Sequence, residues 1–175
     1  MTKNGSVIRP PRIKAYKPTG NTKYDQAAWI MRILTGRTMT MRLIPKHCRK
    51  EVETVLPRNT EEDDVERISE KLRPFLISYQ NLCETMGLHE KASPTISAPL
   101  GLVGQFCVAN DLPALNLLVV SKKYYRPGSD DLITRPGKTY REEQMDAAFK
   151  VNWWSHGTPV PGTFRKVDEY MKNFY

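Results

Sequence analysis

Apolar residues recur at helical spacing along much of this chain, most clearly between Asn59 and Gly87. There, apolar or aromatic residues alternate steps of three and four, at Val65, Ile68, Leu72, Phe75, Tyr79, Leu82 and Met86. Thr60 and the acids after it are typical of a helix start, and Pro74 predicts a kink or a division into two helices. This face, Val65–Met86, predicts packing on the domain's own core or, alternatively, a homodimer contact.

Other segments also predict helices. The apolar residues from Tyr24 onward lie mostly on one side, with Asp25 as the cap and Gly36 as the end. The alternation after Arg37 predicts a short strand or extended passage before Pro45. The full set of predicted helices is Tyr24–Arg37, Lys46–Leu56, Asn59–Gly87, Ala98–Asn110, Tyr140–Asn152 and Thr163–Phe174.

The sequence pattern of one segment predicts a buried strand. Residues Ala114–Val120 are rich in branched and apolar side chains, and Pro127-Gly128 predicts a turn after them. Asp131–Thr134 then predicts a short return strand and hence a hairpin. Residues 88–97 are loop-like. The pattern therefore predicts an α+β fold: a mostly helical single domain with one small β-sheet or hairpin.

The first 23 residues differ from the rest. They contain basic residues and no acid, and Pro10, Pro11 and Pro18 prevent a continuous helix. Their apolar residues are too few to form a core, so we expect an extended basic arm over residues 1–23, attached to a single domain over residues 24–175. Such an arm is either a solvated tail or a binding segment.

Charge is placed very unevenly along the 175 residues. The first fifty carry twelve Lys or Arg and a single acid, Asp25, for a net charge of about +11. The remaining 125 carry fifteen bases and eighteen acids, for a net charge of about −3. A basic excess at one end favours docking on a polyanion or on an acidic protein surface.

Length and cysteine content limit the class of protein. A chain of this length can bury a core without metals or disulfides. The three widely spaced cysteines, Cys48, Cys83 and Cys107, suit free thiols in a reducing compartment. No apolar run reaches the roughly 20 residues that span a bilayer, and no secretory signal is evident. We expect a soluble cytoplasmic protein with no metal and no cofactor.

The segment Lys122–Gly128 places three cations beside two aromatic rings at the end of the predicted strand. Cations contact phosphates, and tyrosine rings stack on exposed bases. A polar hairpin end whose tyrosines cover the core is the alternative. With the arm, these residues give the predicted nucleic-acid-binding set: Arg9, Arg12, Lys14, Lys17, Lys122, Lys123, Tyr124, Tyr125 and Arg126.

A metal-dependent nuclease is the main enzymatic alternative. It would need converging carboxylates near a lysine, and the candidates are Asp130, Asp131, Glu142 or Glu143, with Lys122 or Lys138. The strand before Lys122 contains no acid, which departs from the PD-(D/E)xK nuclease signature. His156 follows Trp153 and Trp154, where a capped helix end with both indoles in the core competes with a histidine at a pocket rim. Catalytic residues are therefore not assigned.

The run Leu112–Val120, followed by Arg126-Pro127-Gly128, is similar to a segment found in small uncharacterised proteins of bacterial and phage mobile elements. This similarity implies an accessory protein of such an element. Three hypotheses follow: a nucleic-acid-binding accessory protein, in which Arg32, Arg37 and Arg42 would also contact phosphates; a nuclease or other nucleotide-acting enzyme; and a protein-interaction subunit that docks on an acidic partner.

Overall fold

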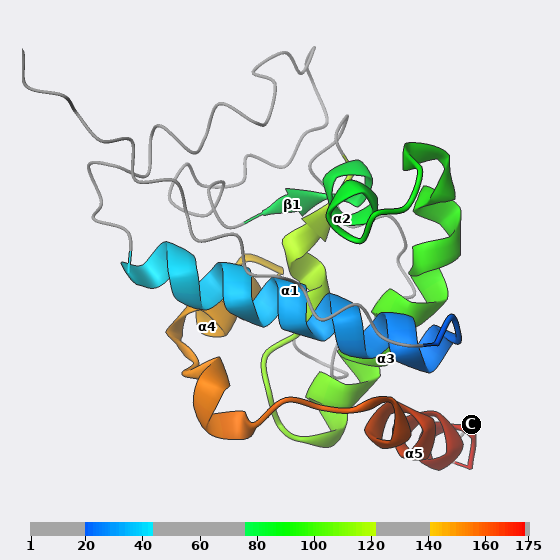
Figure 1. Ribbon diagram of the computed structural model, residues 1–175. Helices are drawn as coiled ribbons and strands as arrows, with labels where there is room; N and C mark the ends of the chain where they lie inside the picture. The colour runs from blue at the N-terminus through cyan, green and yellow to red at the C-terminus, as the bar shows by residue number, and fades with distance from the viewer. Residues whose placement is uncertain (1–19, 44–75, 122–140, 174–175) are drawn as a thin grey trace, which may run out of the picture.

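The computed structural model describes residues 20–43, 76–121 and 141–173, and these residues are mostly helical (Figure 1). The predicted arm is described only from Gly20 onward. In chain order the elements are α1 (Lys23–Leu43), β1 (Ile77–Ser78), α2 (Tyr79–Thr85), the 3₁₀ helix η4 (Glu90–Ile96), α3 (Ser97–Ala109), the 3₁₀ helix η5 (Leu115–Leu118), β2 (Val119–Val120), α4 (Arg141–Lys150), the 3₁₀ helix η6 (Trp153–His156) and α5 (Pro161–Lys172).

Helix α1 is the central element. It contacts α3, α4, α5, η5 and η6, and residues 27–31 are buried one after another. A helix buries five consecutive residues only when neighbours cover it on several sides, so α1 is more enclosed than the predicted one-sided pattern implied. Figure 1 shows α5 beside the N-terminal end of α1 and α4 beside its C-terminal end.

The predicted end of this first helix at Gly36 is wrong, and so is the extended passage that was expected to follow. Helix α1 continues to Leu43. The Thr38 hydroxyl is buried and donates to the Leu34 carbonyl at 2.7 Å, and Met39 is buried one residue later. A glycine inside a helix costs about 1 kcal/mol, which the burial of Thr38 and Met39 against the core offsets.

The small sheet differs from the predicted hairpin. Its two strands are parallel, with Ile77 opposite Val119 and Ser78 opposite Val120. Residues Leu115–Leu118, predicted as strand, form η5, because an apolar run of this length fits a buried helix as well as a strand. The predicted return strand, Asp131–Thr134, lies outside the described residues.

The long predicted helix is interrupted at its C-terminal end. Residues Ile77 and Ser78 are strand, and α2 begins after Ser78, whose hydroxyl accepts a hydrogen bond from the Asn81 backbone N–H at 3.0 Å. Leu82 and Met86 are buried in the core of this chain, so these two side chains are not available to a second copy. The remainder of the predicted dimer face, from Val65 to Phe75, lies outside the described residues.

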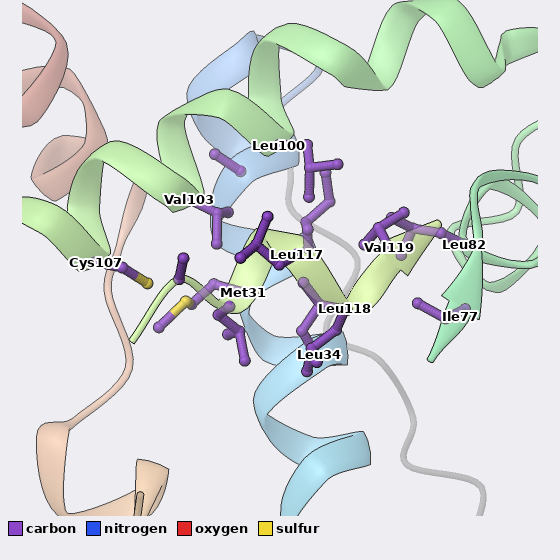
Figure 2. Packing of buried hydrophobic residues seen from close by; sticks show 14 of the residues in the cluster. Met31, Leu34, Ile77, Leu82, Leu100, Val103, Cys107, Leu117, Leu118 and Val119 are labelled. Carbon is purple, nitrogen blue, oxygen red and sulfur yellow. The ribbon is translucent and has the colours of Figure 1, made fainter. Parts of the chain in front are cut away.

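The core lies where η5 and β2 pass between α1 and α3. Figure 2 shows Leu117 and Leu118 reaching between these helices, while Val119 lies beside Leu82. The approach of η5 to α3 is close at Gly104, since a Cβ added there would lie 2.8 Å from the Asn116 amide nitrogen. A residue without a side chain is needed at this contact.

The later helices agree with the pattern. The predicted helix Ala98–Asn110 corresponds to α3, and Met145, Ala148 and Phe149 of α4 are buried as expected. Helix α5 starts two residues earlier than predicted, at Pro161, because proline suits the first turn of a helix. Residues 90–96, predicted as loop, form η4. The mostly helical α+β prediction is thus confirmed, although the sheet is parallel. In the ranges that the structure describes, no helix is both long enough and apolar enough to cross a bilayer.

Candidate nucleic-acid interface

The predicted nucleic-acid-binding residues lie outside the part of the chain that the structure describes. Strand β2 ends at Val120, two residues before Lys122, and its partner strand β1 leads directly into α2. Parallel strands finish at the same edge of a sheet. The chain therefore leaves β2 toward the predicted segment at the edge where α2 begins. The residues concerned are Arg9, Arg12, Lys14, Lys17, Lys122, Lys123, Tyr124, Tyr125 and Arg126.

Arg37 and Arg42, which were predicted to contact phosphates, form hydrogen bonds inside the protein. Arg37 donates from Nη2 to the Leu76 carbonyl at 3.0 Å, just before β1, and burial lowers the pKa of its guanidinium. Arg42 donates from Nη1 to the Val151 carbonyl at 2.8 Å. Arg37 thus positions the start of the sheet. Arg42 is exposed, and it satisfies a carbonyl at the end of α4.

A cluster of four side chains holds the N-terminal end of α1 on α5. The Asp168 carboxylate accepts through one oxygen from Lys23 Nζ and the Tyr24 hydroxyl, both at 2.8 Å, and from Lys172 Nζ at 3.1 Å. The Arg165 guanidinium lies 5.5 Å from the centre of the Tyr24 ring. We call Lys23, Tyr24, Asp168 and Lys172 the Asp168 cluster.

Electrostatics keep Asp168 ionised. Burial alone would raise the pKa of this carboxyl, since its side chain is 10% exposed. Hydrogen bonds from Lys23, Tyr24 and Lys172 outweigh burial and lower the pKa to about 2, while the Asp168 hydrogen bond raises the pKa of Lys23. Asp168 therefore compensates part of the positive charge at the N-terminal end of α1, where one carboxylate meets two ammonium groups.

The opposite end of α1 lies against the turn after α4. There the Trp153 indole is buried and donates from Nε1 to the Ala148 carbonyl at 2.8 Å, which fixes the turn η6. Trp154 is 63% exposed, so the expectation that both indoles lie in the core is wrong for the second. His156 is exposed as well, with its ring 6.4 Å from that of Trp153.

The described residues give no support to a metal site. Across 20–43, 76–121 and 141–173, no three His, Cys, Asp or Glu side chains lie together in a group that could hold a metal ion. Glu143 is exposed on α4, whereas Asp130, Asp131, Lys122 and Lys138 lie outside these ranges. His89 has a local role, since its Nδ1 accepts from the Lys91 backbone N–H at 3.1 Å.

The thiols in the described part of the chain are structural. Cys83 and Cys107 are buried and free. Burial raises the pKa of Cys107 to about 12 and also raises that of Cys83, so both stay protonated near neutral pH. A protonated, enclosed thiol is a poor nucleophile. Cys48 lies outside the described ranges.

Most of the net positive charge of the chain lies outside the described residues. The described residues carry ten Lys or Arg and nine Asp or Glu, a net charge of +1 out of the +8 of the whole chain. Residues 1–19 carry five bases and no acid, and residues 122–140 carry five bases and two acids. Almost all of the positive excess therefore belongs to the arm and to the segment after β2.

The sequence analysis did not identify Trp154 as a surface residue, nor Asp168 as the residue that joins α1 to α5. Adjacent residues on a tight helical turn point in different directions, so the pair Trp153-Trp154 already indicates that one indole lies outside the core. No comparable signal marks Asp168, whose three partners come from both ends of the chain. Comparison with known proteins adds no assignment: no family model, no curated protein and no solved structure matches this chain.

Proposed function

We propose that this protein is a small basic accessory protein that binds nucleic acid. The observation that carries the proposal is the uneven distribution of charge along the sequence: residues 1–19 and 122–140 hold net charges of +5 and +3, whereas the described residues hold +1. Arg37 and Arg42 of α1 form hydrogen bonds within the protein and do not belong to these two segments. Clustered positive charge is typical of phosphate-binding surfaces.

The residues proposed to bind are those of the two basic segments. Arg9, Arg12, Lys14 and Lys17 would contact phosphates, as would Lys122, Lys123 and Arg126, while Tyr124 and Tyr125 would stack on bases. The similarity of residues 112–120 to proteins of bacterial and phage mobile elements supports an accessory role in such an element. A cytoplasmic location fits the same proposal.

Salt dependence of binding tests the proposal. If about six cations neutralise phosphates, a plot of log binding constant against log salt concentration should have a slope of roughly −4 to −5. The double variant Lys122→Gln, Lys123→Gln should reduce the magnitude of this slope by about 2. The matched control is Lys91→Gln, Lys166→Gln, which removes the same charge from exposed positions on η4 and α5.

The outcomes separate the three hypotheses. A binding constant that does not change between low and moderate salt overturns the proposal. Equal losses in the two double variants would reduce the interaction to general attraction by net charge. Binding to an acidic protein but to neither DNA nor RNA would favour the protein-interaction subunit. Cleavage in the presence of Mg²⁺ or Mn²⁺, abolished by Asp131→Asn, would favour the nuclease.

A further inference from the structure

Trp154 is an exposed aromatic residue flanked in the chain by polar residues. It is 63% exposed, and its chain neighbours Asn152, Ser155 and His156 are also exposed. Val160, which is 51% exposed, is separated from it by five residues, of which Ser155 to Thr158 are exposed. Along this stretch of chain, an exposed ring among polar residues differs from the run of apolar side chains that protein–protein contacts use.

Positive charge lies at the segment of chain that leads into η6. Arg42, from the far end of α1, donates to the carbonyls of Val151 at 2.8 Å and Lys150 at 3.4 Å, and Val151 precedes Trp154 by only three residues. Among the described residues no carboxylate forms an ion pair with Arg42. The Lys150 ammonium pairs with Asp146 one turn earlier on α4. Within the described residues, the Arg42 guanidinium therefore has no carboxylate partner at the backbone three residues before Trp154.

Each nucleotide of a single strand offers an exposed base and a phosphate. The indole of Trp154 and the guanidinium of Arg42 are side chains of the types that bind these two groups. A base stacks on the indole face, while the neighbouring phosphate meets the cation. Bases in a duplex are stacked on one another, so their faces are not available to a protein side chain. A four-residue 3₁₀ turn also lacks the long element that enters a DNA groove.

We propose that Trp154 is a stacking site for an unpaired base of single-stranded nucleic acid, with Arg42 beside the adjoining phosphate. This inference rests on the proposed function and narrows it, because it names single strands as the preferred form. It adds a contact surface in the described part of the chain to the basic segments, and it assigns a role to an indole that contributes little to the core.

Tryptophan fluorescence tests this inference directly. The chain has three tryptophans, and Trp29 and Trp153 are 8% and 2% exposed. A fluorescence change on ligand binding therefore reports mainly on Trp154. We expect a twelve-residue oligothymidylate to quench the emission of the full-length protein at low salt. A duplex of the same length should bind with much less quenching.

Variants give an independent readout by fluorescence anisotropy of a labelled oligothymidylate. Trp154→Ala should weaken binding about tenfold, the equivalent of roughly 1.4 kcal/mol, and Trp154→Phe should recover most of the loss. Tyr170→Ala is the matched control, because Tyr170 is 53% exposed on α5. It should change the affinity less than twofold.

The possible failures are distinguishable. If oligothymidylate binds without quenching and Trp154→Ala binds as the unchanged protein does, the stacking site is wrong while nucleic-acid binding stands. Equal losses in Trp154→Ala and Tyr170→Ala also overturn the stacking site, as does tighter binding of the duplex than of the single strand. If neither nucleic acid binds at low salt, the proposed function fails and this inference fails with it.

Discussion

The two ends of α1 use positive charge in opposite ways. At the N-terminal end, Lys23 pairs with the buried Asp168 carboxylate, which compensates one of the two lysine charges in the Asp168 cluster. At the C-terminal end, Arg42 meets only backbone carbonyls after α4 and retains its charge. Three residues after Val151, Trp154 is exposed, whereas Tyr24 at the other end is half-buried. One end therefore ties α1 to α5 through a carboxylate, and the other holds an exposed cation near an exposed aromatic residue in the chain.

The difference follows from what each cation touches. A carboxylate compensates a cation's charge, and an ion pair shielded from water contributes more than one on the surface. A carbonyl offers a partial charge only, which satisfies hydrogen bonds without cancelling the cation. Asp168 thus fixes the N-terminal end of α1 on α5. Arg42, some twenty residues after Lys23, has no carboxylate partner among the described residues. Variants at each end should separate stability from binding.

The largest effect is expected at the N-terminal end. Asp168→Asn keeps the shape of the side chain but removes the charge that three donors share. The pKa of about 2, against an ordinary value of 3.8, corresponds to about 2 kcal/mol of stabilisation at neutral pH. We expect urea denaturation to show a loss of this size. A loss below about 0.5 kcal/mol would mean that the Asp168 cluster does not hold α1 on α5.

Asp146, near the C-terminal end of α1, provides a control for Asp168. Asp146 pairs with Lys150 one turn away on α4, and its side chain is 31% exposed. Pairs of this kind contribute about 0.3–0.5 kcal/mol. Asp146→Asn should therefore change the free energy of unfolding by no more than that amount. Equal losses in the two variants would remove the contrast between the ends.

The second prediction concerns pH. The folded pKa of Asp168 is lowered, so its contribution is complete above the unfolded pKa near 3.8 and disappears as the pH falls toward 2. The stability difference between the unchanged protein and Asp168→Asn should be about 2 kcal/mol at pH 7 and roughly half of that at pH 3. Urea titrations of both proteins at each pH measure it. A difference that grows on acidification would contradict the assigned direction of the shift.

A smaller effect is expected from Arg42. Replacing it with alanine leaves the Val151 carbonyl without its donor, at an exposed site where water can substitute in part. We expect a loss of about 1 kcal/mol in the free energy of unfolding, since a hydrogen bond contributes about 0.5–1.5 kcal/mol. Arg42→Lys, which keeps the charge, should recover part of it. Binding of oligothymidylate should weaken in the alanine variant and much less in the lysine variant.

Much of the helical structure could be predicted from the sequence, because helices α3, α4 and α5 each carry their own apolar face and end signals. Met145, Ala148 and Phe149 show this, as all three are buried. The predictions were wrong where the structure depends on contacts between residues far apart in the sequence. No local sequence pattern shows that Thr38 is buried and that α1 continues past Gly36. Likewise, no local pattern shows that Ile77 pairs with Val119, forty-two residues away.

The candidate sites were less predictable, for two different reasons. The basic segments follow from charge alone, so they could be proposed from the sequence, yet they lie outside the described residues. The Asp168 cluster joins Lys23 and Lys172, which are separated by most of the chain, so no sequence pattern reveals it. The exposure of Trp154 could be predicted in part. It follows from the turn geometry of η6 once Trp153 is known to be buried.

The smallest expected effect on stability completes the comparison. Trp154→Ala removes a large side chain that is 63% exposed, so the free energy of unfolding should change by no more than about 0.5 kcal/mol. Urea denaturation followed by circular dichroism measures this without relying on the deleted indole. A loss of 2 kcal/mol or more would show that Trp154 supports the turn after α4. In that case its exposure would not mark a binding surface, and the C-terminal end of α1 would be a structural junction like the other.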